Sequence, residues 1–383
     1  MFLALCATAA STPVFAQNSV TLYGMVDESI VYSNNQSGHA NVYTRQGNLM
    51  ASRFGLRGTE ALSSTLSAIF DLQEGFDPDN GALGSSGLAF NRQAFFGLQD
   101  TRYGTVTAGR QYTSYYLLLC SLGPNNFLTG ATGAHPGDID GLDTTIRSNN
   151  SVMYTSPTLG GWQASAQYGF GGVAGSMESG STISAALRYD GGPLSVAAGY
   201  LRMNSVSDTA TTTQSASASY GTSAVNAGYT SARAVQHVAA VGVYRIGAVE
   251  LGLNYSNVKY LPGGESLFTD TAVFNTYGAL ARYTFDSNVD VAAGYSYTRA
   301  SKANGIDDSA RYQQVSLKEA YHMSKRTTFY ALQAYQHANG KTLGAAGVSD
   351  VIDANAVIGD SQNSTASSTG NQFVAMLGMA ISF

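Results

Sequence analysis

Hydrophobic and polar residues alternate with a period of two along most of this chain. Leu251, Leu253 and Tyr255, for example, alternate with Asn254 and Ser256. Such alternation is typical of β-strands with one apolar and one polar or small face. We count about sixteen segments of roughly 8–13 residues, close to the length that a tilted membrane strand needs. These strands are expected to begin near residues 20, 52, 66, 89, 105, 151, 162, 182, 194, 233, 249, 273, 289, 311, 327 and 371.

The connections between these segments alternate in length. Short turns, such as 190–193 and 286–288, alternate with long polar stretches. Short turns on one side and long loops on the other are typical of outer-membrane β-barrels, and aromatic residues such as Tyr255 and Tyr295 stand where interfacial girdles would lie. The long stretches cover residues 33–49, 77–88, 112–149, 202–232 and 339–370.

The polar face of the strands separates a membrane barrel from a soluble sandwich. A soluble core cannot be filled with side chains such as Gln163, Gln167, Asn254 and Thr298. A wide barrel can carry them, because sixteen strands enclose a water-filled lumen and expose their other face to lipid. Closure also removes the strand edges that lipid could not satisfy. The pattern therefore predicts an all-β fold, a transmembrane antiparallel barrel of sixteen strands.

Composition supports this interpretation. Charged residues make up 12% of the chain, whereas about 25% is usual in soluble proteins. A low charge is expected where half of each strand faces hydrocarbon. The formal net charge of −5 argues against a nucleic-acid-binding protein that works through a basic face.

The N-terminus has the features of an export signal. Residues 1–10 are almost wholly apolar, and Val14 and Ala16 are small residues at the −3 and −1 positions of a signal-peptidase site. We therefore expect a signal peptide at 1–16 and a mature barrel domain at 17–383. Cys6 leaves a lipoprotein signal as an alternative. After cleavage Cys120 is the only cysteine, which excludes an intrachain disulfide.

Five sequence motifs stand at the expected strands and their ends. They are SVTLYGMVD (19–27), SRFGLRGTE (52–60), NRQAFFGL (91–98), YGTVTAGRQYT (103–113) and RSNNSVMYTSP (147–157). Together with the terminal Phe383 they resemble the general porins of the Gram-negative outer membrane, closest to the beta-proteobacterial branch. The resemblance implies sixteen strands, a homotrimer, an inward-folded third extracellular loop and passage of ions and small hydrophilic solutes. It also implies that the terminal aromatic Phe383 is the signal read by the barrel-assembly machinery.

The resemblance places a constriction loop at about 112–149. Its acids Asp138, Asp140 and Asp143 could present negative charge to the pore, or could instead cap turns beside neighbouring glycines. A stretch of this length inside a compact domain is usually functional or disordered.

Arginines opposite this loop are implied at Arg53, Arg92 and Arg147. Strand parity also puts Arg53 and Arg57 together on the lumen face, because Phe54 and Leu56 alternate with them. Parity does not support Arg92, which shares its face with apolar residues, so its assignment rests on the resemblance.

Arg110 is expected at a subunit contact. It shares the outward face of Val106 and Ala108, where an unpaired charge would be costly. Similar porins place this arginine at the trimer interface, near acids of the second loop. We therefore predict an ion pair with a carboxylate, and Glu74 is our candidate.

The predicted function is a passive outer-membrane channel, without enzyme activity, cofactor or metal. Four arginines (Arg53, Arg57, Arg92 and Arg147) against three loop acids favour a weak anion preference. A substrate-specific channel on the same barrel is the main alternative. A hydrolase barrel is disfavoured because the five histidines are scattered and no nucleophile–base pair follows from their spacing. An adhesin acting through loops such as 204–219 is a further alternative.

Overall fold

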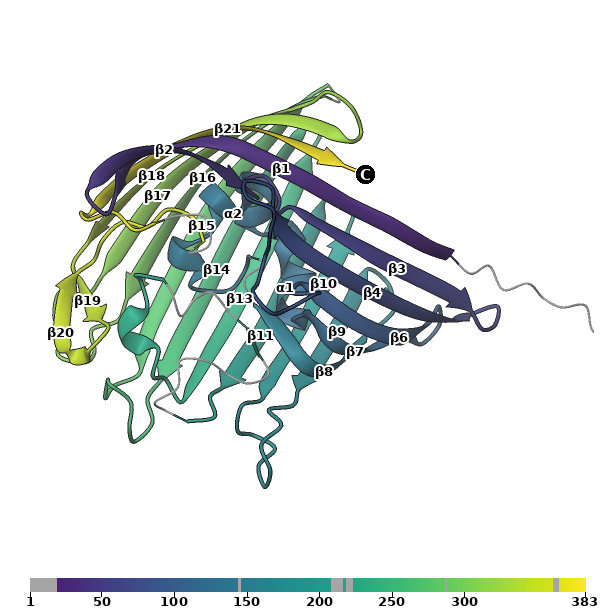
Figure 1. Cartoon of the computed structure of the whole chain (residues 1–383), viewed down its shortest axis with the longest axis horizontal. Helices are drawn as coiled ribbons and strands as arrows, with labels where there is room; N and C mark the ends of the chain where they lie inside the picture. The colour runs from purple at the N-terminus through teal and green to yellow at the C-terminus, as the bar shows by residue number, and fades with distance from the viewer. Residues whose placement is uncertain (1–18, 144–145, 208–215, 218–222, 287, 361–364) are drawn as a thin grey trace, which may run out of the picture.

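Sixteen antiparallel strands close into one barrel (Figure 1). The computed structural model describes residues 19–143, 146–207, 216–217, 223–286, 288–360 and 365–383, so the expected signal peptide lies outside the described residues. The barrel strands are β1 (Ser19–Gln36), β3 (Arg53–Ala61), β4 (Leu66–Asp77), β6 (Gln93–Asp100), β7 (Gly104–Tyr112), β8 (Arg147–Thr155), β9 (Trp162–Gly169), β10 (Thr182–Gly191), β11 (Leu194–Asn204), β13 (Ala234–Ile246), β14 (Val249–Leu261), β15 (Ala272–Phe285), β16 (Val289–Ala300), β17 (Arg311–His322), β18 (Thr327–Asn339) and β21 (Asn371–Ser382).

The barrel closes because the last strand pairs with the first. β21 and β1 are antiparallel from Met25 opposite Ser382 to Ser33 opposite Val374. On its other side β1 pairs with β3 through its first half and with β2 (His39–Gln46) through its second half. The predicted all-β barrel and its strand starts are confirmed, most of them to within one residue.

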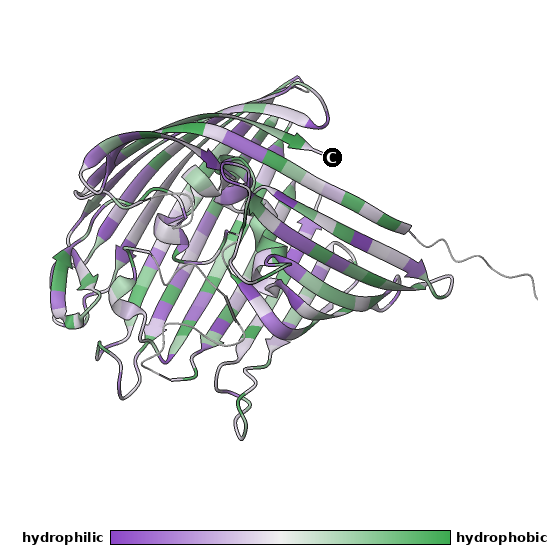
Figure 2. Cartoon of the chain, viewed as in Figure 1, coloured by the Kyte–Doolittle hydropathy of each residue, from purple (hydrophilic) through white to green (hydrophobic). Residues whose placement is uncertain are grey.

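Along the strands the apolar side chains are exposed and the polar ones are buried, which is the reverse of a soluble protein. In β14, Leu253 is 69% exposed while its neighbour Asn254 is 7% exposed. Figure 2 shows the resulting stripes of apolar and polar residues along the strands. The apolar side chains face outward to lipid, and the polar ones face the lumen, as the period-two pattern predicts.

Within the described residues, no helix is long and apolar enough to cross a membrane.

Additional elements lie in the long loops, where the sequence predicted none. The loop elements are β5 (Ala82–Leu83), α1 (Ser114–Leu119), η1 (Cys120–Leu122), α2 (Pro124–Gly133), η2 (Pro136–Asp138), β12 (Ala216–Ser217), η4 (Ala227–Tyr229), and the hairpin of β19 (Lys341–Gly344) and β20 (Gly347–Asp353).

Candidate functional site

The loop between β7 and β8 folds into the lumen and is hydrogen-bonded to the inner wall (Figure 1). Tyr115 N donates to Ser184 Oγ of β10 at 2.9 Å. Farther along, Gln314 Nε2 of β17 donates to the Thr132 carbonyl at 2.7 Å, and Ser316 Oγ donates to the same oxygen. The loop is thus hydrogen-bonded to two separate parts of the inner wall, at β10 and at β17.

Close packing against small wall residues holds the same loop. An added Cβ at Gly294 would lie 2.4 Å from Leu128 Cδ1, and one at Gly199 would lie 2.9 Å from the Tyr115 ring. Tyr115, Leu119 and Leu128 therefore belong to a buried cluster that includes lumen-facing strand residues. Burial of these side chains explains why parts of the inner wall are apolar although the lumen is wet.

Asp140 anchors the loop from beneath instead of facing the pore. Its Oδ2 accepts a hydrogen bond from Ser256 Oγ at 2.5 Å and lies 2.5 Å from His135 Nδ1. Its backbone carbonyl contacts His237 Nδ1 (2.8 Å) and accepts from Tyr115 Oη (2.9 Å). Burial alone would raise the pKa of Asp140, but the neighbouring His135, with these hydrogen bonds and His237, holds that pKa below its usual value.

Burial separates the two alternatives that the sequence left open for the three loop acids. Asp138 and Asp140 are 1% and 0% exposed, and Asp138 Oδ1 accepts from Asp143 N at 3.0 Å. These two acids shape the loop, in line with the turn-capping alternative. Asp143 does line the open cavity beside the loop.

A cavity of ≈ 750 Å³ separates the loop from the wall of the first strands. The loop contributes neutral side chains such as Tyr116, Asn126 and Cys120, whose thiol has a pKa raised by burial. Basic residues outnumber acids in its lining. The charged lining residues are Arg45, Arg53, Arg92, Arg147, Lys318, Lys325 and Arg326 against Asp77, Asp143 and Asp360.

Three of the predicted arginines meet in this cavity. The guanidinium carbons of Arg92 and Arg147 lie 5.9 and 5.4 Å from the centre of the Tyr112 ring. Arg92 Nε donates to Gln73 Oε1 at 2.9 Å, and Arg53 Nη1 donates to the Ala51 carbonyl at 2.9 Å. Within the described residues, none of these three arginines forms an ion pair with a carboxylate.

Arg57 is separate from this group. It lies on the lumen face of β3, with its guanidinium carbon 5.1 Å from the centre of the Tyr23 ring and in register with Asp71. It does not line the cavity. Four residues along a tilted strand, roughly 13 Å, separate it from Arg53.

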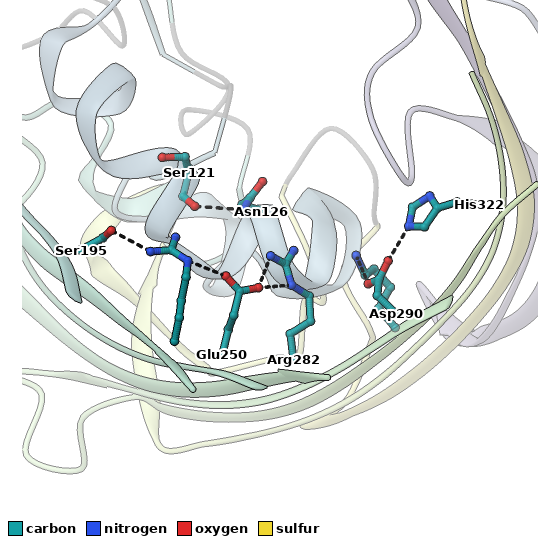
Figure 3. Close-up of polar contacts among 9 residues, drawn as sticks. Ser121, Asn126, Ser195, Glu250, Arg282, Asp290 and His322 are labelled. Atoms are coloured by element: carbon teal, nitrogen blue, oxygen red, sulfur yellow. Dashed lines mark hydrogen bonds and ion pairs between the residues drawn. The ribbon is translucent and has the colours of Figure 1, made fainter. Parts of the chain in front are cut away.

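Sequence reasoning missed a belt of paired charges on the wall formed by the later strands (Figure 3). Glu250 lies between Arg245, at 2.9 Å, and Arg282. Asp290 lies between Lys318 and His322, at 2.9 and 2.7 Å. Register could have shown the first group, because Glu250 is directly opposite Arg245 on β13 and Arg282 on β15.

The belt also contacts the constriction loop. Arg188 Nη1 donates to Ser121 Oγ at 2.5 Å, while its Nε pairs with Asp190 at 2.7 Å. The Arg282 guanidinium carbon lies 4.5 Å from the centre of the Phe127 ring. These wall charges thus contact the loop and are partly neutralised by nearby acids.

Arg110 and Glu74 are joined through Asn91 within one chain. Asn91 N donates to Glu74 Oε2 at 2.7 Å, and the Asn91 carbonyl accepts from Arg110 Nε at 2.7 Å. Arg110 also donates to Asn149 Oδ1. Arg110 and Glu74 are thus linked through one main-chain segment, and Arg110 forms hydrogen bonds within its own chain.

Phe383 completes the seam of the barrel. Its backbone N donates to the Gly24 carbonyl at 3.0 Å, and Gly24 N donates to the Phe383 carbonyl at 3.1 Å. The Phe383 ring covers Gly24 so closely that a Cβ there would lie 2.4 Å from it. The terminal aromatic thus has a structural role in closure.

The described residues contain no group of three or more His, Cys, Asp or Glu side chains that could hold a metal. Ser256 and His135 both contact the same Asp140 oxygen rather than each other. That geometry does not activate a serine, since the base must accept the hydroxyl proton directly.

Comparisons with known proteins agree with this architecture. The family model described as Gram-negative porin matches residues 3–342. The chain is 31% identical to an outer membrane porin protein of Bordetella pertussis, over 84% of this chain and 89% of the relative. It is 34% identical to outer membrane porin protein 32 of Delftia acidovorans, over 51% of this chain and 58% of the relative.

Solved structures share the fold. The anion-selective porin from Comamonas acidovorans superimposes with a TM-score of 0.69 at 23% identity, covering 96% of this chain and all of that one. OmpF of Salmonella typhi, in complex with daunomycin, gives 0.63 at 17% identity, covering 96% and 98%. The chain belongs to the Gram-negative porin family and forms a passive, water-filled channel for ions and small hydrophilic solutes in the outer membrane.

Proposed function

We propose that the channel prefers anions weakly and that Arg53, Arg92 and Arg147 produce this preference. The observation that carries the proposal is the absence of a carboxylate partner for these arginines among the described residues, beside a cavity whose lining is mainly basic. An unpaired charge acts on a passing ion, whereas a paired one is largely cancelled. A structural neighbour from Comamonas acidovorans is itself described as anion-selective.

The loop contributes width and polarity more than charge. Of its three predicted acids, only Asp143 lines the cavity. The field across the passage therefore arises mainly from the arginine side. This proposal retains Arg53, Arg92, Arg147 and Asp143 as constriction residues and excludes Arg57, Asp138 and Asp140.

Reversal potential in a salt gradient tests the proposal. Purified protein in a planar bilayer under a KCl gradient should give a potential whose sign reports chloride as the more permeant ion. The preference should weaken at high salt, because the Debye length falls from about 8 Å at physiological ionic strength to about 3 Å at 1 M. A clear potassium preference at low salt would contradict it.

The family fold supports a channel rather than an enzyme, and we infer that the chain has no hydrolase activity. An absence of turnover of fluorogenic ester and peptide substrates by refolded protein would agree with this. We further infer that residues 1–16 are removed on export, which N-terminal sequencing of protein from outer membranes would test.

We also infer a homotrimer formed through the outward face of the first barrel strands. An apolar groove of ≈ 690 Å³ crosses β1, β3, β4, β6 and β7, and Phe96 beside it is 69% exposed. A structural neighbour, OmpT of Vibrio cholerae, is described in a trimer form.

Because Arg110 is bonded within its own chain, it contributes to this contact by shaping the loop around Asn91. Arg110→Leu should leave the barrel folded and weaken the trimer on native gels, while Phe96→Asp should dissociate it. Heat-stable trimers of Phe96→Asp would place the contact elsewhere.

A further inference from the structure

Two glutamates interrupt the apolar outer face where the last strands meet the first. Glu319 of β17 lies between Leu317 and Tyr321, and Glu28 of β1 lies between Val26 and Ile30. Across the described barrel strands, basic residues on the outward face stand only near the extracellular ends. These are Arg110, Arg202, Lys259, Arg299 and Arg311. The outer face of this chain therefore supplies no cation at the depth of either glutamate.

The two glutamates border one groove of ≈ 620 Å³. Its floor consists of two adjacent rows of residues that are paired across β1, β21, β18 and β17. The groove lies over these rows, where Ala331 has only a small side chain. One row is Glu28, Met379, Phe329 and Tyr321, and the other is Ile30, Leu377, Ala331 and Glu319. The groove is thus apolar along its length with a carboxylate at each of two opposite corners.

Neither carboxylate is fully satisfied. Oε2 of Glu28 and Oε2 of Glu319 are buried and have no hydrogen-bond partner among the described residues. A carboxylate accepts hydrogen bonds and pairs with cations. An occupant that combines an apolar body with a positively charged N–H donor would complement this groove and its two acidic corners.

Size and depth identify the class of occupant. The volume of ≈ 620 Å³ falls within the range of small-molecule sites, about 300–1,000 Å³. Glu319 is two residues, or roughly 7 Å along the strand, from Tyr321. Tyr321 and Phe329 precede and follow the short turn at 323–326, where the periplasmic aromatic girdle and the lipid headgroups lie.

We propose that this groove binds an aminophospholipid, with an acyl chain along Leu377 and Ala331 and the primary ammonium paired with Glu319. Glu28, three strands or roughly 14 Å away at the opposite corner, cannot share that ammonium and adds only its negative charge to the groove. A choline headgroup would bind less well, because its quaternary nitrogen has no N–H to donate.

Native mass spectrometry of the purified protein tests this site. The wild type is incubated with phosphatidylethanolamine or phosphatidylcholine of identical acyl chains, and bound lipid is counted per subunit. We expect at least a threefold higher retention of phosphatidylethanolamine, lost in Glu319→Gln and reduced in Glu28→Gln. Asp286→Asn is the matched control, since it removes one acid from an exposed turn whose φ of +49° asparagine tolerates.

Equal retention of the two lipids by the wild type would overturn the proposal without recourse to any variant. So would unchanged retention in Glu319→Gln. Loss of subunit association instead of lipid in Glu319→Gln would show that a second protein chain covers the groove, and would also overturn it.

Discussion

The two walls of the lumen both carry arginines, and they differ in whether those arginines have acidic partners. On the first strands Arg53, Arg92 and Arg147 border the cavity without a carboxylate partner in the described chain. On the wall formed by the later strands Arg245 and Arg282 share Glu250. A count of lumen arginines would treat the walls alike. From this difference we infer that the unpaired arginines act on passing ions and that the paired ones mainly hold the loop.

The largest effect is expected from removing the unpaired charges. The triple variant Arg53→Gln, Arg92→Gln, Arg147→Gln should abolish the anion preference and bring the chloride-to-potassium permeability ratio to about one. One charge about 8 Å away contributes roughly 0.5 kcal/mol in water, about twofold in the local concentration of each ion. Reversal potentials at low salt measure the ratio. An unchanged ratio with normal conductance would remove these arginines from the account.

Removing the carboxylate that Arg245 and Arg282 share should change the ion selectivity less, and in the opposite direction. Glu250→Gln leaves Arg245 and Arg282 facing each other without a carboxylate. The anion preference should rise by about twofold, because loss of the one carboxylate raises the net charge of this group from +1 to +2. The heat stability of the barrel should also fall, since removing one partner of a partly buried pair leaves like charges unopposed. A variant that becomes less anion-preferring would contradict the distinction between the walls.

Loss of the Asp140 hydrogen bonds that hold the constriction loop should give a still smaller, pH-dependent effect on channel closure. The folded pKa of Asp140 is held below its usual value, so its contribution to stability is present above the unfolded pKa, about 3.9. It is lost only as the pH falls through the lower folded value. Voltage-induced closures should therefore stay constant from pH 7 to about 4 and increase below that. Asp140→Asn should show frequent closures at every pH, and wild-type behaviour of that variant would refute the anchor.

Sequence periodicity located the barrel well because each strand repeats the same constraint. Lipid on one side and lumen on the other force alternation over eight or more residues, so starts such as 162, 182 and 249 could be predicted directly. The helices α1 and α2 were not predicted. Their apolar residues pack against wall glycines far away in the sequence, a contact that no local pattern records.

The candidate site was predicted only in part. Strand alternation gives the face on which a residue lies, but neither its depth in the barrel nor its contacts with distant residues. Parity placed Arg53 in the lumen but could not separate it from Arg57, since depth along a strand has no periodic signal. Strand alternation could not place Arg92, because β6 begins at Gln93 and Arg92 therefore precedes the strand. Its side chain donates a hydrogen bond to Gln73. The sequence left two alternatives open for the loop acids, because burial of Asp140 depends on His237 and Ser256 from other strands.

The central claim is tested most directly by two arginines of one strand. Arg53 and Arg57 both lie on the lumen face of β3, but only Arg53 lines the cavity, whereas Arg57 lies beside Tyr23 and opposite Asp71. Reversal potentials of Arg53→Gln and Arg57→Gln in the same KCl gradient isolate position from net charge. Arg53→Gln should lower the chloride-to-potassium permeability ratio by about two- to fourfold, and Arg57→Gln should leave it at the wild-type value. Equal shifts in the two variants would contradict the account.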